Sequence, residues 1–97
     1  MSKFQGKIAL ITGSGTGIGK AIATKFVEQG ASVIILGRRK EPLEDAAKGL
    51  QEIISQNNSG ATVRIFSGVD VADETAMNGM FDSLKNDNVN VDYVINN

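Results

Sequence analysis

The sequence predicts an α/β fold built around a doubly wound parallel sheet. Four short apolar runs recur along the chain, and segments with helical periodicity separate them. Successive runs begin about 25 to 30 residues apart, which is the length of a strand, a crossover helix and the next strand. Runs that are apolar almost throughout are typical of strands covered on both faces. We therefore expect the order βαβαβαβ with right-handed crossovers.

Each element follows from its own segment. The strands are expected at residues 8–12, 32–36, 62–66 and 91–95. The first helix is expected over residues 18–26, where apolar side chains recur at helical spacing before Gly30, a suitable C-terminal stop. The second helix opens near Pro42, which suits a first turn, and ends at the polar break of residues 57–60. The third begins near Asp73, a good N-cap.

Composition restricts the kinds of partner and chemistry. Ten Lys and Arg oppose eleven Asp and Glu, and a net charge of −1 offers no electrostatic footprint for nucleic acid or an acidic membrane surface. The chain lacks Cys and His, which excludes thiolate metal sites and removes the commonest general base and metal ligand. The apolar run at residues 8–11 is too short for a signal peptide or a membrane span. We expect a cytoplasmic protein with no metal, no nucleic-acid partner and no membrane partner.

Residues 12–19 read Thr-Gly-Ser-Gly-Thr-Gly-Ile-Gly and lie between the first expected strand and the first expected helix. A phosphate-binding P-loop would need glycine in place of Ser14 and a hydroxyl residue in place of Ala21. The dinucleotide fingerprint Gly-x-Gly-x-x-Gly fails as well, because its third glycine would fall on Ile18 or Lys20. Neither of these two common glycine loops is therefore present.

The spacing that fits is Gly-x-x-x-Gly-x-Gly, at Gly13, Gly17 and Gly19. Glycine at the first position permits a sharp exit from the strand, because it adopts positive φ at no steric cost. Without a Cβ, Gly17 lets the backbone approach a pyrophosphate at the helix N-terminus, where free N–H groups and the helix dipole favour negative charge. Gly19 lets the helix pack close to the strand. The expected dinucleotide cradle consists of Gly13, Ser14, Gly15, Thr16, Gly17, Ile18 and Gly19.

This string closely resembles the Thr-Gly-x-x-x-Gly-Ile-Gly motif of the short-chain dehydrogenase/reductase family, and every fixed position of the motif is present. The resemblance implies a Rossmann-type sheet, of which four strands lie in this chain. It also implies an NAD(P)-dependent oxidoreductase. Such an enzyme transfers hydride between the nicotinamide and a small-molecule carbonyl, alcohol or enoyl substrate, with acyl thioesters among the candidates.

The residues after the second expected strand bear on the choice of cofactor. Relatives that use NAD usually carry an acidic residue there for the ribose hydroxyls, whereas residues 37–40 read Gly-Arg-Arg-Lys. No carboxylate stands there to repel a 2′-phosphate, and guanidinium groups bind phosphate through bidentate, charge-assisted hydrogen bonds. We expect Arg38 and Arg39 to contact that phosphate, and NADP to be preferred over NAD. A solvated basic loop is the alternative, and Thr16 stands where many NADP-preferring relatives have a basic residue.

Two further segments resemble the family in the expected order. Asp70 and Val71 follow the third expected strand and resemble the Asp-Val pair that reads adenine. In that pair the carboxylate accepts from the exocyclic amine, and the next backbone amide meets the ring. Asn96 and Asn97 resemble the first half of the Asn-Asn-Ala-Gly motif. The resemblance implies that Asn97 lines the cofactor pocket.

No catalytic residue is expected in this chain, because the family's catalytic Ser, its Tyr-x-x-x-Lys pair and its helix Asn lie beyond the fourth strand. The single tyrosine, Tyr93, is followed four residues later by Asn97 rather than Lys, and its apolar strand predicts core packing. We expect residues 1–97 to be the N-terminal part of one dinucleotide-binding domain, truncated before the catalytic half. The intact protein is expected to be a homo-oligomeric enzyme. A non-catalytic dinucleotide-binding module or redox sensor of the same fold is the alternative.

Overall fold

Four parallel strands form the centre of the fold. The computed structural model describes residues 3–13 and 17–97, and its sheet has the strand order β3-β2-β1-β4. The elements in chain order are β1 (Ile8–Thr12), α1 (Gly17–Glu28), β2 (Ser32–Gly37), α2 (Lys40–Asn57), β3 (Val63–Ser67), α3 (Glu74–Asn86) and β4 (Tyr93–Ile95). The expected α/β class and the expected βαβαβαβ order are confirmed.

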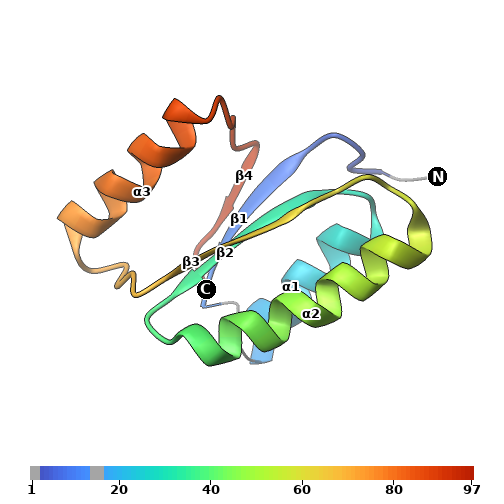
Figure 1. The fold of residues 1–97 in the computed structure, drawn as a ribbon, viewed down its shortest axis with the longest axis horizontal. Coiled ribbons are helices and arrows are strands. Elements are labelled where there is room, and N and C mark those ends of the chain that lie inside the picture. Colours follow the sequence, from blue (N-terminus) through green and yellow to red (C-terminus); the bar gives the residue numbers. More distant parts are fainter. Residues whose placement is uncertain (1–2, 14–16) are drawn as a thin grey trace.

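Helices cover both faces of the sheet. α1 and α2 lie together on one face, and α3 lies on the opposite face (Figure 1). Because successive strand residues point to opposite faces, β1, β2 and β3 each supply side chains to both apolar layers. Ile11 and Ile35 are buried in the layer under α1 and α2, whereas Leu10 and Ile34 are buried in the layer under α3. The parallel register places each member of these pairs beside its partner on the next strand, so the two layers are continuous across β1 and β2.

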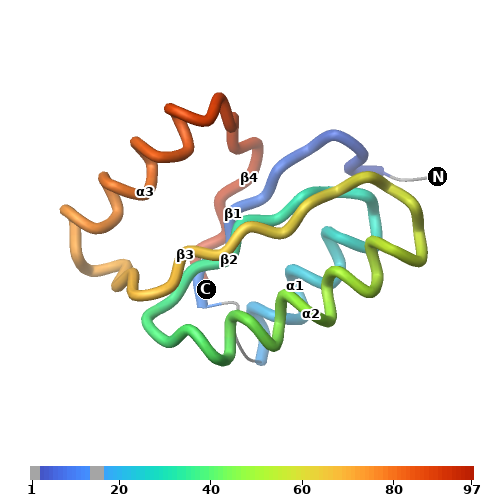
Figure 2. Tube along the Cα trace, in the orientation of Figure 1, coloured from blue at the N-terminus to red at the C-terminus, as the bar shows by residue number. Residues whose placement is uncertain are grey.

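The strand order brings together connections that lead to opposite faces of the sheet. β1 lies between β2 and β4, and the chain runs outward from β1 through β2 to β3 before it returns to the other side of β1 as β4 (Figure 2). The segment that leaves β1 enters α1 on one face, and the segment that leaves β3 enters α3 on the other. Open α/β sheets hold their ligands at such a point, beside the carboxyl ends of the strands.

Local signals at the helix ends agree with the expected elements. The Asp73 carboxylate accepts a hydrogen bond from the N–H of Ala76 at 3.1 Å, so this residue is the N-cap of α3 as expected. Asn58 ends α2 in the left-handed conformation at φ +52°. α2 begins at Lys40, two residues before Pro42, and the proline occupies its first turn. These ends depend on residues close in sequence, which is why the sequence predicts them well.

The fourth strand differs from the expectation of burial on both faces. Val94 is 53% exposed, and Tyr93, expected to pack in the core, is 37% exposed. The centroid of the Tyr93 ring lies 5.6 Å from that of Phe4 and 5.7 Å from that of Phe26. The tyrosine ring therefore packs against these two rings. In the described sheet β4 pairs only with β1. An apolar run therefore predicted the strand correctly but not the degree of its burial.

Gly49→Ala is expected to raise the free energy of unfolding by about 0.5–1 kcal/mol, because glycine inside a helix costs backbone entropy that alanine does not. Gly49 lies within α2, and a Cβ built on it meets no atom within 4 Å in the described part of the chain. Urea unfolding of the full-length protein would measure the change. A loss of stability would show that this face of α2 is covered in the intact protein.

Candidate functional site

Two adjoining cavities open at the carboxyl ends of the strands. The first has a volume of about 250 Å³ and is called here the arginine cavity; its lining residues are Gly13, Leu36, Gly37, Arg38, Arg39, Pro42 and Leu43. The second has a volume of about 220 Å³ and is called the aspartate cavity; its lining residues are Thr12, Gly13, Leu36, Gly37, Arg38, Val69, Asp70, Val71 and Asn97. Four residues, Gly13, Leu36, Gly37 and Arg38, border both cavities, so the two cavities adjoin at the ends of β1 and β2.

The described glycines of the motif lie directly after β1 and in the first turn of α1. Gly13 has φ +63° and Gly17 has φ +61°, values in the left-handed region that favours glycine. The positive φ expected at Gly13 is thus present. A Cβ built on Gly17 meets no atom within 4 Å among residues 3–13 and 17–97, so the space beside this backbone is open. Three residues of the expected cradle, Ser14, Gly15 and Thr16, lie outside the described residues.

Close packing explains the third glycine of the motif. Gly19 is buried in the first turn of α1. A Cβ placed on it would lie 2.9 Å from the Asn97 side-chain nitrogen, and it would lie closer still to the carbonyl of Gly13. Because no real Cβ tolerates such contacts, only glycine lets α1 begin this close to the end of β1.

A hydroxyl group joins the ends of β1 and β4. Thr12 is 4% exposed, and its hydroxyl donates to the carbonyl of Ile95 at 3.5 Å and accepts from the backbone N–H of Asn97 at 2.9 Å. The side-chain amide of Asn97 donates in turn to the carbonyl of Gly13 at 3.3 Å. The reasoning from sequence assigned no role to Thr12. Its place at the start of the glycine motif was the signal that could have identified it.

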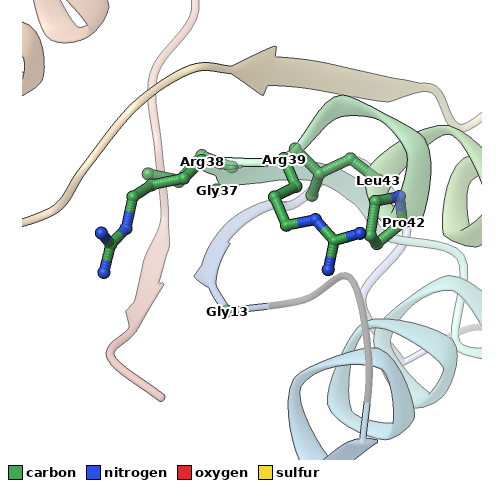
Figure 3. Close-up of a pocket in the computed structure, with 7 residues that line it drawn as sticks. Gly13, Gly37, Arg38, Arg39, Pro42 and Leu43 are labelled. Carbon is green, nitrogen blue, oxygen red and sulfur yellow. The ribbon is translucent and has the colours of Figure 1, made fainter.

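The two arginines take different directions. In Figure 3, Arg39 extends into the space between Gly13 and Pro42, whereas Arg38 extends away from it. Arg39 precedes α2 in extended backbone at φ −104° and ψ 128°, and its side chain makes no capping hydrogen bond. Arg38 borders both cavities. Pro42 also lines the arginine cavity, although the sequence indicated only a helix start there.

Asp70 and Arg38 lie opposite each other at the mouth of the aspartate cavity. Arg38 Nη1 is 3.9 Å from Asp70 Oδ2, with the side chains 78% and 42% exposed. The other oxygen of Asp70 accepts from the N–H of Ala72 at 2.9 Å. Val71 is 56% exposed beside them. Two residues predicted from separate segments therefore form one charged pair.

The fold brings together half of the expected site residues. Six of them line the cavities: Gly13, Arg38, Arg39, Asp70, Val71 and Asn97. Gly17, Ile18 and Gly19 form the first turn of α1 and are not among the lining residues. In the described part of the chain, no group of three or more acidic residues is placed to hold a metal ion. No helix there is long and apolar enough to cross a membrane.

The chain is similar in sequence to known proteins. A family model described as short chain dehydrogenase matches residues 7–97. A probable 2,4-dienoyl-CoA reductase of Caenorhabditis elegans is 42% identical over 81 residues, which cover 84% of this chain and 24% of that protein. An NADP-dependent (R)-specific alcohol dehydrogenase of Lentilactobacillus kefiri is 39% identical over 95 residues, which cover 98% of this chain and 34% of that protein.

Two solved structures of oxidoreductases are also similar to this chain. The L-sorbose reductase of Gluconobacter frateurii, complexed with NADPH and L-sorbose, superposes with a TM-score of 0.83 at 34% identity, covering 100% of this chain and 35% of that one. An NAD⁺-bound xylitol dehydrogenase superposes with a TM-score of 0.81 at 34% identity, covering 95% of this chain and 33% of that one. The chain thus spans between a quarter and a little over a third of the lengths of these proteins.

Gly19→Ala is expected to lower the free energy of unfolding by about 1–3 kcal/mol, because the new methyl group would overlap the carbonyl of Gly13. Chemical unfolding of the full-length protein measures the loss. Gly49→Ala is the matched control, since it adds the same group to a helix at a site with open space. Equal stability of the Gly19 variant and the parent protein would contradict the close approach of α1 to β1.

Thr12→Val is expected to cost about 1–3 kcal/mol of unfolding free energy, because it leaves the N–H of Asn97 without its acceptor. Valine keeps the shape of threonine and removes only the hydroxyl. Thr12→Ser keeps the hydroxyl and should lower the free energy of unfolding less than Thr12→Val does. If valine and serine were equally tolerated in thermal or urea unfolding, the hydroxyl would not join the two strands.

Proposed function

Since this chain belongs to the short-chain dehydrogenase family, we propose that the intact protein is an NAD(P)-dependent oxidoreductase and that residues 1–97 supply the cofactor-binding part of one dinucleotide-binding domain. The observation that carries the proposal is that Gly13, the first glycine of the motif, lines both cavities together with Arg38, while Arg39 lines one of them and Asp70 the other. The bound cofactor would supply the hydride-transfer chemistry. The residues of this chain would bind and orient it.

The start of α1 supports the proposal that a dinucleotide binds here through its pyrophosphate. The first N–H groups of a helix have no partner within the helix and point outward with the positive end of its dipole. α1 begins at Gly17, where the backbone faces open space in the described structure. Gly17 carries no side chain that would keep a diphosphate from the amides of Gly17, Ile18 and Gly19. This geometry supports the proposed cradle at the start of α1.

The cavities fit the adenosine end of the cofactor. Val69, Val71 and Leu36 give the aspartate cavity apolar walls suited to a planar base, and Asp70 places a carboxylate at its mouth. Arg38 and Arg39, which both carry guanidinium groups, line the arginine cavity at the end of β2, beside Gly37, which carries no side chain. We propose that these groups bind a 2′-phosphate and that NADP is preferred over NAD. Two observations support this preference: Arg38 and Arg39 are positively charged, and Gly37 stands where a carboxylate would repel the 2′-phosphate.

The substrate class is proposed from the relatives. Their names include an alcohol dehydrogenase, a sugar reductase and a dienoyl-CoA reductase. We propose a small-molecule carbonyl, alcohol or enoyl compound, with acyl thioesters among the candidates. Titration of the full-length protein with NADPH, followed by oxidation of NADPH in the presence of ketones and enoyl thioesters, tests the proposal. Binding without turnover on any of them would favour a non-catalytic dinucleotide-binding module, and failure to bind NADPH or NADH would refute the proposal.

The double variant Arg38→Gln/Arg39→Gln is expected to reduce the preference for NADPH over NADH about ten- to a hundredfold, because a charge-assisted hydrogen bond contributes about 1.5–3 kcal/mol. Fluorescence titration of the full-length protein with both cofactors measures the two dissociation constants. The matched control is Lys40→Gln/Lys48→Gln, which removes the same charge from residues that border neither cavity. An equal effect on both cofactors would mean that neither arginine binds the 2′-phosphate.

A further inference from the structure

The strand at one end of the sheet has an open edge. In the described part of the chain, β3 pairs only with β2. The N–H of Val33 on β2 donates to the carbonyl of Thr62 at 3.0 Å. Backbone groups alternate in direction along a strand, so those of Val63 and Ile65 point away from β2. An extended strand of another molecule can therefore bond to this open edge of β3.

The sequence of β3 suits such pairing, with one exception. Residues 61–67 read Ala-Thr-Val-Arg-Ile-Phe-Ser, a segment rich in β-branched and aromatic residues and free of proline. Short segments of this kind pair readily between molecules when their net charge is low. Arg64 carries the only charge of the segment. It is therefore the residue that distinguishes this strand from an aggregation-prone edge.

Arg64 extends over the sheet face that α3 covers. It lies beside Ile34 in the register of β2 and β3, and Ile34 is buried in the layer under α3. The guanidinium carbon lies 5.0 Å from the centroid of the Phe66 ring, two residues further along the same strand. Arg64 Nη2 lies 2.6 Å from Asp87 Oδ2. Contacts with two different elements therefore keep this charge over the edge strand.

The end of α3 holds Asp87 in place. The N–H of Val89 donates to the carbonyl of Leu84 at 2.9 Å, and Asn88 has φ +58°. This hydrogen bond and this left-handed residue are features of a Schellman motif, which closes the last turn of a helix. A carboxylate is unfavourable at the negative end of a helix dipole unless a cation neutralises it. Arg64 supplies that cation, so the ion pair suits both elements.

Pairing of β3 with the β3 of a second copy would bring two of these ion pairs together. In an antiparallel pair related by a two-fold axis, the registers that join most of the strand place each Arg64 opposite or diagonal to its counterpart, on the same face. Like charges in such positions are destabilising. The side chains of Arg64 and Asp87 are 37% and 54% exposed, and the second copy would remove part of this exposure. The desolvation of the charges also opposes association.

We propose that Arg64 keeps the open edge of β3 from pairing with the same edge of a second copy of this protein. The charge of Arg64 is the protecting element, and the contacts with Phe66 and Asp87 hold it over the strand. A charge on an edge strand that points toward a covered face is one of the means by which natural proteins protect such edges. The three residues lie outside the linings of both cavities, so this inference is independent of the proposed function.

Replacement of Arg64 by an uncharged strand-forming residue tests the proposal. In sedimentation of the full-length protein, Arg64→Val should form assemblies larger than those of the parent protein, with self-association about tenfold tighter. Arg64→Thr should do the same, so the test does not depend on the folding of one variant. Arg64→Lys keeps the charge and should sediment like the parent protein. If the valine and threonine variants sedimented like the parent protein at every concentration, the proposal would be overturned.

Two control variants separate the edge from other causes of association. Asp87→Asn breaks the ion pair but leaves the charge of Arg64 on the strand, so it should sediment like the parent protein. Association as tight as that of Arg64→Val would overturn the proposal, because a loosened end of α3 would then be the cause. Lys48→Val removes a positive charge and adds the same side chain on the exposed surface of α2. It should also leave sedimentation unchanged, and equal association would overturn the proposal in favour of general surface hydrophobicity.

Proline on the open edge identifies the surface that joins the copies. The N–H of Val63 points away from β2, so Val63→Pro removes an edge donor and no hydrogen bond of the described sheet. Val63 is also the first residue of β3, a position at which strands accept proline. In the Arg64→Val background, Val63→Pro should restore the sedimentation of the parent protein. Persistence of the large assemblies would show that another surface joins the copies, and the proposal would be overturned.

Discussion

The hydrogen bond from the N–H of Asn97 to the buried hydroxyl of Thr12 is the contact on which the site depends. β1 and β4 are neighbours in the sheet although more than 80 residues separate them in the chain. The carboxyl ends of β1 and β4 must remain in contact for Gly13 to keep its position beside Asn97. The side chain of Asn97 extends this contact to the carbonyl of Gly13, and Gly19 packs against the same carbonyl. One small polar cluster thereby sets where α1 begins.

Beyond this cluster, the site combines a rigid backbone with side chains that can adjust. β1 and β2 are buried between two apolar layers, and Gly13 follows directly after the first of them. Arg38 is 78% exposed, and its partner Asp70 is held by backbone contacts rather than by burial. Rigid main-chain amides suit an invariant diphosphate, whereas exposed charged side chains suit the groups that distinguish one nucleotide from another. The proposed function assigns the two kinds of contact in this way.

The sequence predicts the elements well because each leaves a local signal. The strand at residues 8–12, the N-cap at Asp73 and the stop before Gly30 depend on residues within one or two turns of each other. The site is predictable only in part. The glycine spacing identified the turn, but Thr12 and Pro42 were missed because their roles arise from contacts with distant strands or from lining a cavity. Core packing was predicted for Tyr93, but its side chain is 37% exposed among the described residues, because β4 pairs there only with β1.

By itself, the sequence determined the order of strands and helices, the spacing of the glycine turn and the chemical character of the residues after β2 and β3. These features follow from periodicity, conformational preference and charge, which act over a few residues. Only the tertiary structure decided that Asp70 faces Arg38, that the two arginines diverge and that Thr12 joins β1 to β4. The ion pair and the strand contact join groups far apart in the chain, and the divergence depends on backbone angles. The register and packing of the sheet bring such groups within reach of each other.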